Sequence, residues 1–176
     1  MGFQDAIRAG LRQYATFAGR ASRSEYWYFA LFIVLGAAGL SIVDSILFGD
    51  DPATGKPRHV ISALFQLATV VPLLAVGWRR MHDSGRPGWY NLLPMLVSIG
   101  IVVLLLGGAA MVGMAGMMPH PGPQAQGGMA AAGLLAGGIF VVTLMVLQLA
   151  LALLMLWWLT RPSDPDANAY GPPPKP

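Results

Sequence analysis

The chain of 176 residues contains no cysteine and very few charged residues. Without cysteine it has no disulfide framework, no thiol chemistry and no thiolate metal site. Charged residues make up 11% of the chain, against about 25% in ordinary soluble domains, which is too few to cover the surface of a soluble globular enzyme. The hydrophobic fraction of 55% also excludes an intrinsically disordered chain.

Long apolar runs replace the missing charges. Residues 87 to 160 contain no Asp, Glu, Lys or Arg, and the mean hydropathy of the chain is +0.58. A membrane-spanning helix needs about 20 apolar residues, whereas a transmembrane strand needs about 10 and alternates polar with apolar positions. We therefore predict an all-α membrane protein with four transmembrane helices, over residues 26–48, 60–78, 89–113 and 129–159.

The basic residues predict the orientation. Nine of the eleven Lys and Arg fall before the first span, between the second and third spans, or in the tail, while Lys56 and Arg58 fall between the first and second spans. Because positive charge favours the cytoplasmic side, both termini are predicted there, with a cytoplasmic segment 1–25, a transmembrane domain 26–160 and a proline-rich tail 161–176. Basic residues in so hydrophobic a chain fit a membrane surface, so no nucleic-acid partner is expected.

The first residues have the spacing of a short amphipathic helix. Its apolar positions fall within a sector of about 80° and are Phe3, Ile7, Leu11 and Tyr14. Two placements remain open: the helix lies in the cytoplasmic headgroup layer, or its apolar stripe packs on the helix bundle.

Three polar motifs lie on the predicted cytoplasmic side: FAGRASRSEYWY at 17–28, RRMHDSGRPGW at 79–89 and NAYGP at 168–172. Their order and content resemble the DUF805 family of small bacterial inner-membrane proteins, which has no established biochemical function. The resemblance implies a multi-pass protein of the bacterial inner membrane and supplies no catalytic residues. We expect the third motif to fold back onto the other two.

The first two motifs contain the candidate site residues. They are Arg20, Arg23, Glu25, Trp27, Arg79, Arg80, His82, Asp83, Arg86 and Trp89. Guanidinium groups are planar donors suited to phosphate, and the nearest phosphate is that of an anionic phospholipid headgroup. The leading hypothesis is a non-enzymatic integral membrane protein whose cluster binds such a headgroup or a protein partner, with a homo-oligomer also open. The alternative is that the arginines only set topology and pair with the two acids.

The sequence leaves two further functions open. An enzyme acting on a lipid-like substrate would use His82 and Asp83 as acid–base groups, but neighbours on a helix point about 100° apart. A small transporter would need a polar pathway through Asp44, Gln66 and Gln148. The sequence predicts no catalytic residue, no metal site and no cofactor. It favours a histidine that locks its loop by hydrogen bonds, and a flexible extracytoplasmic loop over 114–128.

Overall fold

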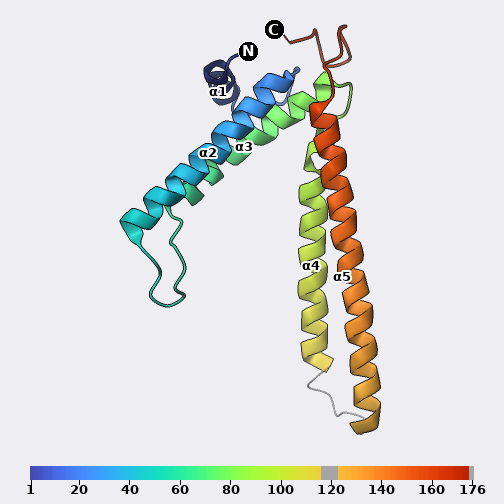
Figure 1. Cartoon of the computed structure of the whole chain (residues 1–176). Helices are drawn as coiled ribbons and strands as arrows, with labels where there is room; N and C mark the ends of the chain where they lie inside the picture. The colour runs from blue at the N-terminus through green and yellow to red at the C-terminus, as the bar shows by residue number, and fades with distance from the viewer. Residues whose placement is uncertain (116–122, 175–176) are drawn as a thin grey trace. The chain divides into compact units, whose positions relative to one another are not determined.

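The computed structural model describes residues 1–115 and 123–174, without the side chains of 111–113, 115 and 123–136. Its elements are α1 (Phe3–Arg12), α2 (Arg23–Phe48), α3 (Ile61–Asp83), the 3₁₀ helix η1 (Gly88–Leu92), α4 (Leu93–Ala115) and α5 (Pro123–Thr160) (Figure 1). Within the described ranges there is no β-strand, only two isolated bridges. The prediction of an all-helical chain is confirmed.

Four stretches are long and apolar enough to cross a membrane, as predicted. They are Arg23–Phe48, Ile61–Asp83, Gly88–Ala110 and Gly137–Thr160. Helix α5 begins earlier than the sequence suggested, at Pro123, where proline suits a first helical turn because its missing N–H is not needed there. The expected loop at 114–128 is therefore helical at both of its described ends, and its residues 116–122 lie outside the described part of the chain.

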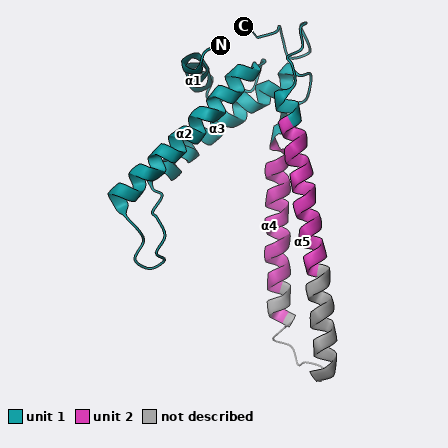
Figure 2. Ribbon diagram, in the orientation of Figure 1, with its two compact units in different colours: residues 1–91, 157–176 teal, residues 92–156 magenta. Residues whose placement is uncertain are grey.

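The chain divides into two compact units, one of residues 1–91 with 157–176 and the other of residues 92–156 (Figure 2). In the first unit, α2 and α3 run side by side in opposite directions (Figure 1). Its small core consists of Ala21, Phe29 and Val76, with Phe32 and Leu73 packed against them. Side chains that elsewhere would form a larger core are exposed on these helices, as expected for surfaces that contact lipid tails.

Helix α1 packs on α2 through small residues. Its buried positions are Ala6 and Gly10, and a Cβ added at Gly10 would lie 2.5 Å from the ring of Phe29. The rings of Phe3 and Tyr28 pack in a T-shaped arrangement with their centres 6.0 Å apart, while Leu11 is 46% exposed. The contact with α2 accounts for part of the apolar stripe, and insertion of the rest among headgroups stays a prediction.

Asp44, near the end of α2, connects this helix to the start of α3. Its carboxylate is fully buried and accepts hydrogen bonds from the Ile61 amide (2.8 Å), the Ser62 amide (2.9 Å) and the Ser62 hydroxyl (2.6 Å). Val60, which precedes α3, supplies no capping side chain, so α2 provides the cap for the first amides of α3. This role explains an acid within an apolar span.

In the described part of the second unit, the side chain of Gln148 connects α5 to α4. The Gln148 amide nitrogen donates to the Ser98 hydroxyl at 3.0 Å and to the Pro94 carbonyl at 3.3 Å. The surrounding side chains are aliphatic and line a groove of about 530 Å³, with Ile101, Leu105 and Leu144 among them. A hydrogen bond between helices is the expected use of a lone amide in an apolar segment.

Candidate functional site

The second motif ends helix α3 with a glycine. Gly85 has a φ of +71°, its amide donates to the His82 carbonyl at 3.1 Å, and the Arg86 amide donates to the Met81 carbonyl at 3.0 Å. These bonds form a Schellman motif, in which a left-handed residue, usually glycine, satisfies the last carbonyls of a helix. The turn stops α3 immediately after Asp83, so Arg79, Arg80, His82 and Asp83 occupy its last two turns.

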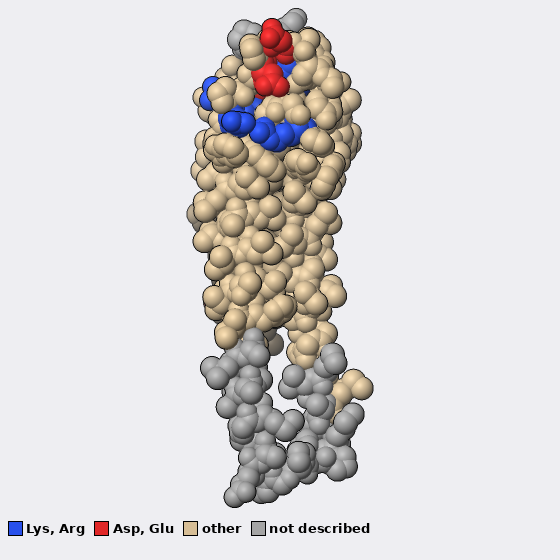
Figure 3. Space-filling view, turned by 90° about the vertical axis from the view of Figure 1, so that its right-hand side faces the viewer, with Lys and Arg blue, Asp and Glu red and all other residues tan. Residues whose placement is uncertain are grey.

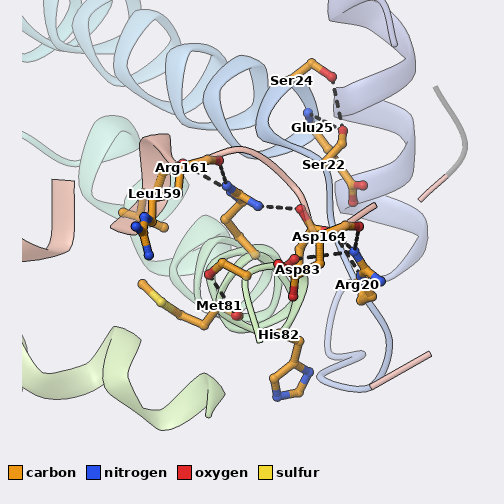
Figure 4. A network of polar contacts seen from close by, with 12 residues as sticks. Arg20, Ser22, Ser24, Glu25, Met81, His82, Asp83, Leu159, Arg161 and Asp164 are labelled. Carbon is orange, nitrogen blue, oxygen red and sulfur yellow. Dashed lines mark hydrogen bonds and ion pairs between the residues drawn. The ribbon is translucent and has the colours of Figure 1, made fainter. Parts of the chain in front are cut away.

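Asp83 joins two arginines inside the protein (Figure 4). Its carboxylate is fully buried; Oδ1 accepts from Arg20 Nε at 3.0 Å and Oδ2 accepts from Arg80 Nη1 at 2.5 Å. Arg20 belongs to the first motif and Arg80 to the second, so one carboxylate links the two. Two buried guanidiniums share this single negative charge.

The other donors of these two arginines hold the chain after α5. Arg20 donates to the carbonyls of Asp164 (2.6 Å), Asp166 (2.7 Å) and Gly171 (3.3 Å). Arg80 donates to the Leu159 carbonyl at 3.1 Å and to the Arg161 carbonyl. The last carbonyls of α5 lack partners within the helix, and a buried cation suits that negative end of the helix dipole. The third motif is thereby brought onto the first two, as expected.

Arg79 forms a second buried pair on another side of α3. Its Nη1 donates to Glu25 Oε1 at 3.0 Å and to Gln13 Oε1 at 2.5 Å, and its backbone carbonyl accepts from the Ala21 amide at 3.0 Å. Its Nε and Nη2 are buried and have no hydrogen-bond partner among the described residues. Arg79 thus ties α3 to the start of α2 and to the chain after α1.

His82 is held on three sides. Its Nδ1 lies 3.1 Å from the Gly19 carbonyl, which can only accept, so this nitrogen carries the proton. The ring stacks on Tyr170 at 3.8 Å with 5° between the planes, and the Asn168 side-chain amide donates to the His82 carbonyl at 3.0 Å. The ring therefore closes the loop of the first motif and the turn of the third over the end of α3.

The predicted site residues separate into two sets. The buried set, called the clasp below, consists of Arg20, Glu25, Arg79, Arg80, His82 and Asp83. The remaining four, Arg23, Trp27, Arg86 and Trp89, are exposed or half-buried. On the face shown in Figure 3, charged side chains gather at one end and the rest of the described surface is uncharged.

Two of the less buried arginines, Arg86 and Arg161, lie beside aromatic rings. The Arg86 guanidinium is 5.2 Å from the centre of the Trp158 ring, and that of Arg161 is 4.5 Å from the centre of the Trp157 ring. Partial burial, with the like charge of Arg161, lowers the pKa of Arg86 from its ordinary value. An arginine stays protonated at neutral pH despite such a shift. We call Arg23, Arg86 and Arg161, with Trp27, Trp89, Trp157 and Trp158, the basic–aromatic rim.

Arg161 and Tyr170 were not among the predicted site residues, although Arg161 lies on Trp157 and Tyr170 stacks on His82. Arg161 follows Trp157 by four positions, a spacing that places two side chains on one helix face and that would have indicated the contact. Asp164 and Asp166 hold Arg20 through backbone carbonyls, for which the sequence carries no signal, because every residue has one.

The residues proposed for a transporter pathway do not come together as one. Asp44 caps α3, Gln148 binds Ser98, and Gln66 is exposed on the described surface. His82 and Asp83 bind different groups. Among the residues that the structure describes, no three His, Asp or Glu are grouped to hold a metal ion.

Comparison with known proteins identifies a protein family whose model matches this chain, and curated proteins with similar sequences. The model of a family described as "Protein of unknown function (DUF805)" matches residues 14–172. The protein named "Inner membrane protein YhaI" from Escherichia coli K12 is 38% identical over 96 residues, which cover 54% of this chain and 75% of the relative. "Inner membrane protein YhaH" from the same strain is 32% identical over 96 residues, covering 54% and 77%. No solved structure matches the chain.

Proposed function

The chain belongs to the DUF805 family, and from this premise we propose that it is a bacterial inner-membrane protein whose rim binds anionic phospholipid headgroups at the cytoplasmic surface. In this proposal the clasp joins the ends of the helices, and the basic–aromatic rim contacts the lipid. Two observations support the proposal. One is the distribution of charge along the chain, and the other is that, among the described residues, the arginines of the clasp are in ion pairs whereas those of the rim are not.

The proposed orientation is supported by the basic residues. Nine of eleven lie in segments that would be cytoplasmic, and curated relatives carry the name inner membrane protein. Fusion of a fluorescent protein or alkaline phosphatase to the C-terminus tests it. We expect a fluorescent first fusion and an inactive second fusion, because alkaline phosphatase matures only after export; active phosphatase would refute the orientation.

The pairing of the arginines supports lipid binding by the rim. The three ion pairs found within residues 1–115 and 123–174 use Arg20, Arg79 and Arg80, and none uses a rim arginine. A phosphate that bound the clasp would have to displace a buried carboxylate, and breaking such a pair costs about 3–5 kcal/mol. Binding to Arg86 or Arg161 carries no such cost, and each of these two guanidiniums lies beside an indole, a ring that favours the membrane interface. This contrast is the observation on which the proposal rests.

The test removes two rim charges and compares the lipid that remains on the purified protein. A basic residue near an anionic membrane surface contributes about 1 kcal/mol, so the double variant Arg86→Gln/Arg161→Gln should lower enrichment of anionic lipid by up to about thirtyfold. The matched control is Lys56→Gln/Arg58→Gln, which removes two charges from the predicted opposite side. Equal lipid profiles in the two variants would contradict the proposal.

A further inference from the structure

A pocket of about 390 Å³ opens at the first turns of α2. Its described lining consists of Arg23, Ser24, Trp27, Tyr28 and Thr160. The volume falls within the range of about 300–1,000 Å³ typical of small-ligand sites. Trp27 is 37% exposed and Tyr28 is 38% exposed, so the two rings are accessible from outside the protein.

Arg23 supplies an available positive charge. It is exposed and belongs to none of the ion pairs found in the described part of the chain. The clasp behind it does not neutralise it, because Arg20 and Arg80 already share the one carboxylate of Asp83, and Arg23 repels Arg80. The acid nearest in sequence, Glu25, is bound to Arg79. An anion placed against Arg23 would offset an excess of positive charge that the protein leaves uncompensated.

Ser24 can add a neutral donor. Its hydroxyl lies 3.1 Å from that of Ser22, and either oxygen can donate to the other. When Ser22 donates, the Ser24 proton is available to a ligand. A guanidinium and a hydroxyl on one side of a pocket are suited to phosphate oxygens, and charge-assisted bonds of this kind are the strong ones.

The rest of the lining selects the source of the phosphate. Trp27 and Tyr28 present the amphipathic rings that accumulate where lipid headgroups meet acyl chains, at the start of a predicted span. The described lining contains neither Asp nor Glu, so it offers no carboxylate to a headgroup ammonium. A phosphodiester bearing hydroxyls instead of an amine fits this chemistry.

We propose that the pocket at Arg23, Ser24, Trp27 and Tyr28 is a binding site for the headgroup of one anionic phospholipid of the phosphatidylglycerol type. Arg23 pairs with the phosphodiester, Ser24 donates to it, and the two rings flank the glycerol portion. The proposal rests on the rim function above and assigns it a particular site.

The experiment measures single-lipid binding by native mass spectrometry of the full chain in a mild detergent. The ligands are phosphatidylglycerol, phosphatidylethanolamine and inorganic phosphate, each titrated separately. We expect the first phosphatidylglycerol molecule to bind more tightly than any further phosphatidylglycerol molecules. It should also bind more tightly than phosphatidylethanolamine. Arg23→Gln should weaken that first binding step by about tenfold or more, and Arg23→Lys by less, because a hydrogen bond to a charged group contributes about 1.5–3 kcal/mol.

Arg8→Gln, which removes an exposed arginine from α1, is the matched control and should leave the first step unchanged. Arg23→Gln should not lower the melting temperature, since Arg23 has no ion pair to lose in the described part of the chain and its charge repels Arg80. Unchanged binding in Arg23→Gln would overturn the site, and so would displacement of the lipid by inorganic phosphate. Loss of bulk anionic lipid in Arg86→Gln/Arg161→Gln with an intact first step in Arg23→Gln would refute this pocket alone. The reverse pattern would refute the general role of the rim and leave the pocket.

Discussion

Replacing Asp83 by Asn is the sharpest perturbation of the clasp. The substitution keeps the size and shape of the side chain and removes its charge. Arg20 and Arg80 would then remain buried without the carboxylate that they share, although their bonds to backbone carbonyls persist. We expect the chain after α5 to detach from the end of α3, because releasing it lets both guanidiniums reach water.

The expected effect is large because every group involved is buried. The exposed fraction of the side chain is 1% for Arg20 and 0% for Arg80 and Asp83. Removing one partner of a buried ion pair costs about 3–5 kcal/mol, since the other charge is left uncompensated. At about 1.4 kcal/mol per factor of ten, the equilibrium between docked and released tail should shift by roughly a hundredfold to a few thousandfold.

The absence of cysteine makes the assay clean. A spin label attached to Ala169→Cys, an exposed position within the third motif, reports the mobility of the tail in detergent or nanodiscs. The label should be restrained in the parent chain and mobile when Asp83→Asn is added, with a lower melting temperature. Asp166→Asn is the matched control, because it also removes one carboxylate but leaves the backbone carbonyl that binds Arg20.

An unchanged spectrum together with an unchanged melting temperature in Asp83→Asn would refute the reasoning. The shared carboxylate would then contribute nothing beyond what the backbone carbonyls already provide, and the clasp would be held by the neutral contacts of His82 and its neighbours.

Two further predictions concern packing and capping. Asp44→Ala should lower the melting temperature of the purified protein because the first amides of α3 lose their acceptor, whereas Asp50→Asn on the exposed loop should not; equal melting would contradict the cap. Gly88→Ala should destabilise by about 1–3 kcal/mol, since the added Cβ would lie 2.0 Å from the Trp78 side chain. Gly100→Ala, where an added Cβ meets nothing within 4 Å, is its control in the same melting assay.

The third motif shows how far the family resemblance extended the sequence reasoning. Its co-occurrence with the other motifs led us to expect that it folds back, and Tyr170 does stack on His82. The carbonyl partners of Arg20 could not be predicted, because they lie 144 to 151 residues away and every residue has a backbone carbonyl.

The number and approximate placement of the apolar helices followed from the sequence alone. A run of about 20 residues without charge has one low-energy state in hydrocarbon, a helix that pairs its own backbone groups, so composition was sufficient. Which arginines are buried was decided only by tertiary structure. Arg79, Arg80 and Arg86 look alike in the second motif, yet the first two are enclosed by α2, the loop before it and the chain after α5, while the third lies on an indole. Burial depends on neighbours brought together from distant parts of the chain, and a buried guanidinium needs a carboxylate that an exposed one does not.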